Sequence, residues 1–273
     1  VSLNEIAIFY RTNAQSRVLE EAMGRFRLPY VLIGGLRFYE RAEVKDLLSY
    51  CRLAQNADDT ASWLRVVNTP RRGIGKTTVG RVETIAAERG LSVPAAARAM
   101  VASAERFRGK DKLSVFVELI ARMRVAVEGA RADTAGKLIL DLSGLKAALE
   151  REESIENQSR LENLAALISA MSDHAQSAPD PSLTGYLEQV ALVTDVDRLD
   201  GDRDVVSMMT MHAAKGLEYD VTFVCGLEDG IVPHGRVHTE QRNTEEERRL
   251  LYVAMTRARK TMHLSFARMR WRF

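Results

Sequence analysis

Hydrophobic positions in the first 33 residues predict a β-α-β unit. Residues 6–10 form a short apolar run that is typical of a buried strand. Apolar residues then recur every three or four positions over 18–26, which predicts an amphipathic helix that ends before Pro29. Residues 30–33 form a second apolar run. We therefore expect two parallel strands joined by a right-handed helical crossover.

The pattern changes after this unit. Apolar residues at helical spacing dominate the next 170 or so positions, and alternating β-branched runs are scarce there. The clearest predicted helices cover residues 42–55, 78–89, 113–127, 158–172 and 182–193. The sequence therefore predicts a mostly helical block over 35–204.

Apolar runs resume near the C-terminal end and predict strands at 205–211, 221–226 and 261–267. Thr244 and Glu247 have the spacing of a capping box, which predicts that a helix begins near Glu245. We expect an α/β domain made of 1–34 and 205–273 and interrupted by the helical block. The two ends of the block then lie close together, because they leave and rejoin one sheet.

Composition indicates an ordinary soluble globular protein, with 46% hydrophobic and 28% charged residues. No apolar run approaches the roughly 18 residues of a membrane span, and the N-terminus lacks the form of a secretory signal, so we expect a cytoplasmic protein without a membrane partner. Cys51 and Cys225 lie in separate apolar runs and are expected to be buried free thiols. The abrupt start at Val1 is typical of a segment of a longer protein.

Positive charge gathers at the C-terminal end although the net charge is only +2. Residues 242–273 hold nine Arg or Lys against three Glu. Phosphate affinity depends on such local clusters, so the segment favours an anionic ligand, with a solvated basic helix face as the alternative.

Two stretches combine features of a nucleotide site. An apolar strand at 205–211 stops at a polar turn that holds His212, Lys215 and Glu218, and the helix expected after Glu245 ends near Arg257. Open α/β sheets present residues to nucleotides at the carboxyl ends of their strands in this way. An Arg at the end of a packed helix suits a phosphate, because its planar fork can bind two oxygens at once.

These stretches resemble the UvrD/Rep/PcrA-type superfamily 1 DNA helicases. Met209-Thr-Met-His-Ala-Ala-Lys-Gly-Leu-Glu-Tyr is similar to motif V, and Glu245-Glu-Glu-Arg-Arg-Leu-Leu-Tyr-Val-Ala-Met-Thr-Arg-Ala to motif VI. The segments that begin at Tyr10 and Gly34 resemble those that follow motif IV. The likeness covers nearly the whole chain, but only the C-terminal half of such a helicase. It implies a RecA-like domain 2A (1–34 and 205–273) and an inserted domain 2B (35–204).

The resemblance also implies roles at an ATP site. Arg257 matches the arginine finger that reaches the γ-phosphate, and Glu218 matches the carboxylate that binds the ribose. Gly216 lets the turn approach the nucleotide, and Lys215 would serve phosphate and interdomain contacts. The Mg²⁺ that accompanies ATP would be held by the N-terminal RecA-like domain of the same protein. A surface charge or helix cap is the alternative for Glu218.

The likeness assigns contacts with single-stranded DNA to Asn13, His212, His234 and Phe273. Binding a strand without reading its sequence needs aromatic faces for bases and cations or amides for phosphates. Trp271 could equally be the stacking residue instead of Phe273, and a lone His such as His212 is often only a packed or surface residue. Metal binding by His234 and His238 is disfavoured, because neither a Cys nor a third His lies nearby.

Gly73-Ile-Gly-Lys-Thr-Thr imitates a phosphate-binding loop. The P-loop pattern needs a Gly where Pro70 stands, and the preceding residues 63–68 look helical where a P-loop follows a buried strand. A glycine turn between two helices also exposes N–H groups to an anion. It resembles the turn by which domain 2B touches the duplex ahead of a fork, so Gly73, Gly75, Thr78 and Lys45 are candidate duplex contacts. A simple helix-helix turn is the alternative.

ATP hydrolysis also needs a phosphate cradle, a Mg²⁺ ligand and a carboxylate that positions water, and this chain lacks all three. We therefore expect the C-terminal half of an ATP-dependent 3′–5′ DNA helicase of repair or replication, inactive alone, that works on single strands and on junctions with a duplex. Repair proteins are further expected partners. The alternatives are a helicase-nuclease subunit and a non-catalytic DNA- or protein-binding module.

Overall fold

The structure is a computed structural model that describes residues 1–196, 204–234 and 241–268. The chain divides into two compact units. The sheet unit holds Val1–Arg41 and Leu192–Phe273, and the helical unit holds Ala42–Ala191. The sequence placed these divisions at 34 and 204, so the structure moves both of them.

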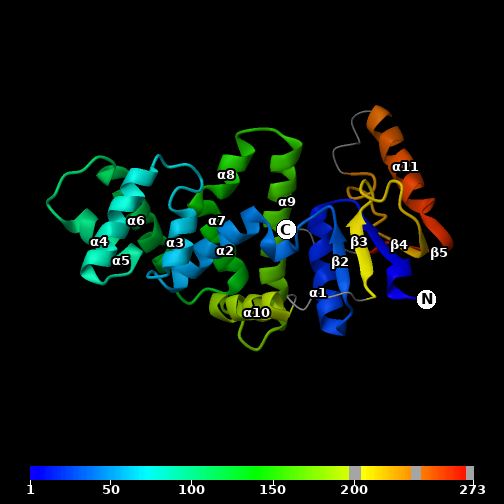
Figure 1. The fold of residues 1–273 in the computed structure, drawn as a ribbon, viewed down its shortest axis with the longest axis horizontal. Helices are drawn as coiled ribbons and strands as arrows, with labels where there is room; N and C mark the ends of the chain where they lie inside the picture. Colours follow the sequence, from blue (N-terminus) through cyan, green and yellow to red (C-terminus); the bar gives the residue numbers. More distant parts are fainter. Residues whose placement is uncertain (197–203, 235–240, 269–273) are drawn as a thin grey trace. The chain divides into compact units, whose positions relative to one another are not determined.

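The sheet unit is built on five parallel strands. They are β1 (Ile6–Tyr10), β2 (Tyr30–Ile33), β3 (Val206–Thr210), β4 (Tyr219–Cys225) and β5 (Ala258–Ser265). Their order across the sheet is β2-β3-β1-β4-β5. The predicted α/β class with a parallel sheet and a helical insertion is confirmed, and Figure 1 shows yellow β3 beside blue β2 although more than 170 residues separate them.

One prediction about the sheet is wrong in detail. The strands β1 and β2 belong to one parallel sheet, but they are not neighbours, because β3 lies between them. The first β-α-β unit therefore leaves a gap one strand wide, and the chain fills this gap when it returns from the helical unit. The backbone N–H of Val206 donates to the Pro29 carbonyl 3.0 Å away, so β3 begins level with β2.

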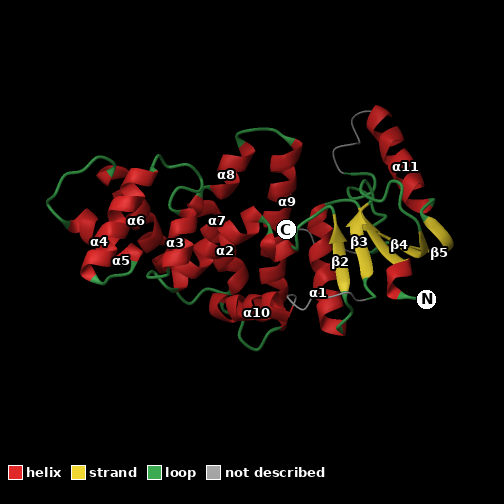
Figure 2. Ribbon diagram, in the orientation of Figure 1, coloured by secondary structure: helices red, strands yellow, loops and turns green. Residues whose placement is uncertain are grey.

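Alternating side chains of β1 divide the core of the sheet unit into two layers. Ala7 and Phe9 point to the face covered by α11 (Gln241–Met255), where Ala254 is buried. Ile8 and Tyr10 point to the face covered by α1 (Ser16–Phe26). Figure 2 shows these helices on either side of the yellow strands. Short 3-10 turns lie at Leu3–Glu5, Asn13–Gln15 and Phe38–Glu40.

The helical unit is α-helical in every regular element that the described residues show, as the apolar spacing predicts. Its helices are α2 (Ala42–Gln55), α3 (Thr60–Val66), α4 (Lys76–Arg89), α5 (Val93–Ala102), α6 (Lys110–Ala126), α7 (Ala132–Ser143), α8 (Leu145–Glu150), α9 (Ile155–Ser177) and α10 (Leu183–Val196). Trp63 and Phe116 meet edge to face in its core, with ring centroids 5.8 Å apart. Over the described ranges, no helix is long and apolar enough to cross a membrane.

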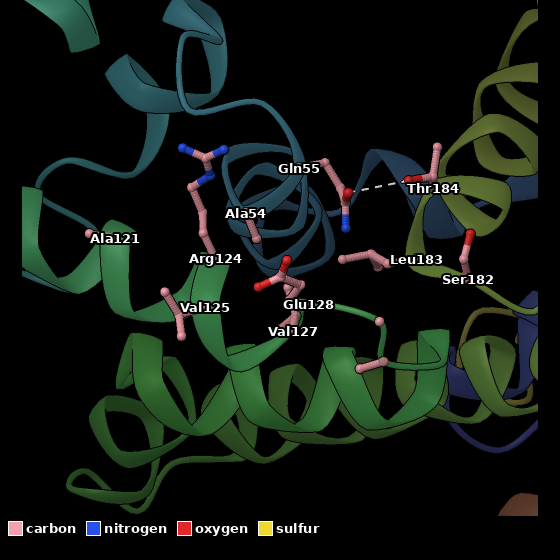
Figure 3. A pocket seen from close by; sticks show the side chains of 12 residues that line it. Ala54, Gln55, Ala121, Arg124, Val125, Val127, Glu128, Ser182, Leu183 and Thr184 are labelled. Carbon is pink, nitrogen blue, oxygen red and sulfur yellow. Dashed lines mark hydrogen bonds between the residues drawn. The ribbon is translucent and has the colours of Figure 1, made fainter.

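A cavity of about 650 Å³ opens between α2, α6 and α10 in the helical unit (Figure 3). Ala54, Val127 and Leu183 contribute apolar surface, while Arg124 and Glu128 contribute charge. None of the residues that the sequence singles out lines it. The cavity is therefore separate from the candidate sites described below.

A buried charge network explains why the sheet unit extends to Arg41. The Glu20 carboxylate accepts hydrogen bonds from Ser16 Oγ (2.5 Å) and from the Phe38 backbone (3.0 Å). The Arg41 guanidinium donates to Ser16 Oγ (2.6 Å) and to the Asn13 carbonyl (2.9 Å), and it lies 3.8 Å from Glu20. Glu20 and Arg41 are only 8% and 7% exposed. The segment between β2 and α2 is thus fastened to α1.

Replacing Glu20 by Ala should destabilise the sheet unit by about 3 kcal/mol or more, because it leaves the Arg41 charge buried without its carboxylate. Urea unfolding of the 273-residue chain measures this change. Glu245→Ala is the matched control, since its bond to Arg248 lies on the surface with side chains 52% and 75% exposed. Such a pair contributes less than about 1 kcal/mol. Equal losses in the two variants would show that the network does not stabilise the unit.

Candidate functional site

Three loops meet at the carboxyl edge of the parallel sheet. Residues 11–15 follow β1, residues 211–218 follow β3, and residues 226–234 follow β4. Since β1 lies between β3 and β4, the three loops are neighbours. This edge is where open α/β sheets bind ligands. The predicted residues Asn13, His212, Lys215, Gly216, Glu218 and His234 all lie on these loops. The 211–218 segment leaves β3 at this edge and returns to the amino edge, because Glu218 directly precedes the parallel strand β4.

The 211–218 turn is anchored by its apolar residues and presents its polar ones. Met211 and Ala214 are buried, and the Met211 N–H donates to the Tyr10 carbonyl at 2.8 Å. The side chains of His212, Lys215 and Glu218 are exposed. Gly216 has a φ of +87°, and no atom lies within 4 Å of where its Cβ would be. This open, left-handed position allows the turn to approach a ligand closely.

Arg257 lies beside this turn. Its Nη1 donates to the Leu217 carbonyl at 3.3 Å, and its Nε donates to Val253 in the last turn of α11 at 3.0 Å. The Arg257 carbonyl accepts the Tyr219 N–H at 3.0 Å. Arg257 is therefore half-buried, and its guanidinium lies against the backbone just before Glu218, held by neutral acceptors. Among the described residues no carboxylate pairs with it, so its charge stays available for an anion.

The predicted start of α11 is wrong. The helix begins at Gln241, so Thr244 lies inside it and cannot be its N-cap. Glu247 turns to Arg11 instead of capping the helix. The Thr-x-x-Glu spacing matched a capping box by chance, because the Glu serves a tertiary ion pair.

Arg11 is a cation at this edge that sequence reasoning did not single out. It follows directly after the buried strand β1, and this position is the signal that could have identified it. The Gln15 side chain accepts the backbone N–H groups of Arg11 (2.9 Å) and Thr12 (3.0 Å), which fixes the start of the loop. The Arg11 guanidinium forms a forked ion pair with Glu247, at 2.6–3.0 Å.

The environment lowers the pKa of His212. Neighbouring protein atoms remove part of the water around the imidazole, and the nearby charge of Arg11 adds repulsion. Glu247 and Glu246 oppose this shift without reversing it. The ring is therefore neutral at pH 7, where a neutral imidazole can both donate and accept a hydrogen bond.

The other predicted strand contacts are only partly placed. His234 is half-buried at the end of the 226–234 loop, and Asn13 lies in the turn after β1, where Arg41 binds its carbonyl. Phe273 and Trp271 lie outside the described residues, as does His238. The edge thus brings Asn13, His212 and His234 onto adjacent loops.

The glycine turn lies in the helical unit, after helix α3 and not after a strand, so the rejection of a P-loop is confirmed. Gly73 has a φ of +72°, and Gly75 is the N-cap of α4. The Asn68 side chain accepts the N–H groups of Arg72 (2.8 Å) and Ile74 (3.3 Å), so the turn is held from within. The hydrogen bonds to Asn68 therefore hold the backbone of the turn in one conformation, with Gly73 and Gly75 exposed to solvent.

Two further contacts place the remaining duplex candidates. A Cβ on Gly73 would meet Lys112 Nζ at 2.5 Å, so this cation lies against the turn. Thr78 is half-buried in the first turn of α4 beside Gly109. Lys45 is exposed on α2, which runs through the middle of the helical unit, whereas α4 lies at one end of it (Figure 1). Lys45 is thus not part of the turn itself.

Comparison with known proteins shows the family of the chain. The sequence model of the UvrD-like helicase C-terminal domain matches residues 1–269. The chain belongs to this family. It is similar to the ATP-dependent DNA helicase PcrA of Bacillus subtilis (strain 168), at 40% identity over 277 residues that cover 99% of the chain. The PcrA proteins of Staphylococcus epidermidis (39% over 275 residues, 99% of the chain) and Staphylococcus aureus (38% over 274 residues, 98%) are also similar.

These PcrA relatives are much longer than the chain. The chain spans 38% of the Bacillus protein and 37% of each Staphylococcus protein. The resemblance inferred from motifs V and VI is confirmed at the level of the family.

Replacing Arg11 by Gln should raise the pKa of His212, because the repulsion from the guanidinium disappears while Glu247 keeps its charge. A proton NMR titration of the imidazole, assigned with His212→Gln, measures the shift. Arg25→Gln removes an exposed cation from α1 and should leave the His212 pKa unchanged. An unchanged or lower pKa in Arg11→Gln would mean that Arg11 does not act on this ring.

Proposed function

We propose that this chain is the C-terminal part of an ATP-dependent DNA helicase that moves 3′ to 5′ along a single strand and serves DNA repair or replication. One observation carries the proposal: the Arg257 guanidinium lies at the foot of the turn that presents Glu218, 3.3 Å from the Leu217 carbonyl. Glu218 directly precedes β4 and Arg257 directly precedes β5, so this carboxylate and this cation lie at the amino edge of two paired strands. A cation suits the phosphates of a nucleotide, and a carboxylate can accept hydrogen bonds from its ribose hydroxyls.

The residues at this edge fit one wall of an ATP site. Arg257 would bind the γ-phosphate as an arginine finger, since its charge has only neutral partners in the described contacts. Glu218 would accept hydrogen bonds from the ribose hydroxyls, and Gly216 leaves room for the ligand. Lys215, exposed on the same turn, would serve phosphate and interdomain contacts. Transfer of the γ-phosphoryl group to water, with ADP as the leaving group, would supply the free energy for movement.

This wall is expected to be insufficient by itself. The phosphate cradle, the Mg²⁺ ligands and the water-positioning carboxylate would come from an N-terminal RecA-like domain of the same protein. The fragment should therefore neither hydrolyse ATP nor unwind DNA. Such a protein would act in the cytoplasm, and repair proteins would be its partners.

The DNA contacts fall into two groups. Asn13, His212 and His234, together with Phe273, would contact the single strand; the first three lie on adjacent loops of the sheet unit. Gly73, Gly75 and Thr78 would hold phosphates of the duplex through the exposed N-terminus of α4, with Lys45 as a further cation. A ligand bound more tightly in one state of a protein shifts it toward that state, so ATP and DNA bound to the same unit would be able to drive motion.

In the full-length protein, Arg257→Ala should lower kcat for ATP by about 10³-fold or more, because the γ-phosphoryl charge loses its cation. Steady-state ATPase assays with saturating single-stranded DNA measure this loss. Arg259→Ala is the matched control: Arg259 is exposed, and its charge is compensated by Asp220 and Glu5. Unchanged turnover in Arg257→Ala would discard the finger assignment.

Lys45→Gln should weaken binding to forked DNA and reduce the slope of log Kd against log salt by about 0.9, as expected for one lost phosphate contact. Thr78→Val should weaken binding without changing the slope, because it removes a neutral donor. Fluorescence anisotropy over a salt series measures both effects. Lys146→Gln, an exposed cation of α8, is the control. Wild-type affinity and slope in both test variants would contradict a duplex contact.

A further inference from the structure

A bulge interrupts the pairing of β4 with β5 near the amino ends of the two strands. Tyr219 pairs with Ala258, whereas Val221 pairs with Thr261. Two residues of β5 therefore lie opposite the single residue Asp220 of β4. An extra residue of this kind bends its strand and changes the direction of nearby side chains, and such bulges are common next to active sites.

Asp220 binds both of the residues that lie opposite it. Its Oδ1 accepts a hydrogen bond from Arg259 Nε at 3.0 Å, and its Oδ2 accepts one from Lys260 Nζ at 2.6 Å. The bond from Lys260 lowers the pKa of Asp220, and the bond from Arg259 adds to this effect, so the carboxylate stays ionised at neutral pH. Successive side chains of a regular strand point to opposite faces, and the bulge brings both cations to one carboxylate.

The bulge also sets the position of Arg257. If the pairing beyond the bulge continued unchanged to the start of β5, Arg257 would lie level with Leu217. The extra residue brings it level with Glu218 instead, a displacement of roughly 3.3 Å along the strand. The Tyr219 N–H donates to the Arg257 carbonyl at 3.0 Å, as this shifted register requires. The bulge thus places Arg257 beside Glu218.

We infer that Asp220 is a positioning residue for the amino edge of β4 and β5, where it holds the bulge that brings Arg257 level with Glu218. This inference rests on the proposed function, in which Arg257 binds the γ-phosphate. Exposed ion pairs add little to the free energy of unfolding, so the effect of Asp220 lies in the geometry of the site and not in the stability of the fold. Without the carboxylate, the two cations of the bulge lose their common partner, and the position of Arg257 is no longer fixed.

In the full-length protein, Asp220→Asn should lower kcat for ATP by about tenfold or more, because misplacing a catalytic group by about 1 Å can cost about 10²-fold. Steady-state ATPase assays with saturating single-stranded DNA measure this change. The Kd for a single-stranded oligonucleotide should keep its wild-type value, because Asn13, His212 and His234 lie on the loops that follow the carboxyl ends of the strands.

A double-mutant cycle with Arg257→Ala separates positioning from general damage. Because Asp220 acts through Arg257, Asp220→Asn should change kcat by less than about twofold once the guanidinium is absent, since residues that act as a unit are not additive. A purely structural role would lower kcat by the same factor in both backgrounds, and this outcome would overturn the inference. A wild-type kcat in Asp220→Asn would overturn it as well.

Glu5→Gln is the matched control. Glu5 is the second acidic partner of Arg259, and its side chain is exposed. The substitution leaves both hydrogen bonds of Asp220 in place, so kcat should stay at the wild-type value. Equal losses in Glu5→Gln and Asp220→Asn would mean that surface charge, and not the bulge, governs the rate, and the inference would then be wrong.

The double variant Arg259→Ala with Lys260→Ala removes the same two hydrogen bonds from the side of β5, and it covers the case in which Asp220→Asn does not fold. Its kcat should fall as in Asp220→Asn, whereas Arg259→Ala alone leaves Lys260 bound to Oδ2 and the bulge in place. Full activity in the double variant would contradict the inference. Failure of the proposed function is distinguishable, because Arg257→Ala itself would then retain its turnover.

Discussion

The parallel pairing of β1 with β3 and β4 is the constraint on which the sheet unit depends. β1 and β3 are 200 residues apart in sequence, yet Ala7 pairs with Ser207 and Tyr10 with Thr210. Loop closure over such a length costs free energy, but this cost grows only with the logarithm of the loop length. The pairing offsets it by burying Ala7, Phe9, Met208 and Met209 completely. Because the register is exact to one residue, the loops after these strands meet at one edge.

Arg11, which follows β1, and Arg257, which precedes β5, differ in how their charge is balanced. Arg11 is neutralised by a carboxylate, whereas Arg257 is held by backbone carbonyls and a hydroxyl. A carboxylate partner offsets part of the desolvation cost of a half-buried cation, and removing that partner would leave the cation uncompensated. A cation bound only to dipoles retains its full charge for an incoming anion. The unit can therefore remain folded while it presents one uncompensated cation at the turn.

Much of this arrangement could be predicted from the sequence. Runs such as 6–10 and 30–33 showed the strands because buried parallel strands are apolar along their whole length. The motif V and VI segments pointed to Glu218 and Arg257, and Arg257 contacts the carbonyl of Leu217, the residue before Glu218. The spacing of Thr244 and Glu247 led to a wrong prediction of where α11 begins, because a Glu can serve either a capping box or a tertiary ion pair. Nothing local in the sequence shows that Glu247 reaches Arg11, 236 residues away.

The boundary between the two units also differs from the predicted one because of a buried ion pair. Gly34 looked like the end of the first domain because the apolar pattern stops there, but the polar network of Ser16, Glu20 and Arg41 extends the sheet unit by several residues. Hydrophobic periodicity predicts elements that bury an apolar face, but it does not predict segments that are held by buried charges. Both surprises in the sheet unit, at Glu20 and at Glu247, are carboxylates that bind an Arg distant in sequence. In the sheet unit, pairing of apolar strands therefore determines the fold. Buried ion pairs then fix the positions of its loops and the point where the unit ends.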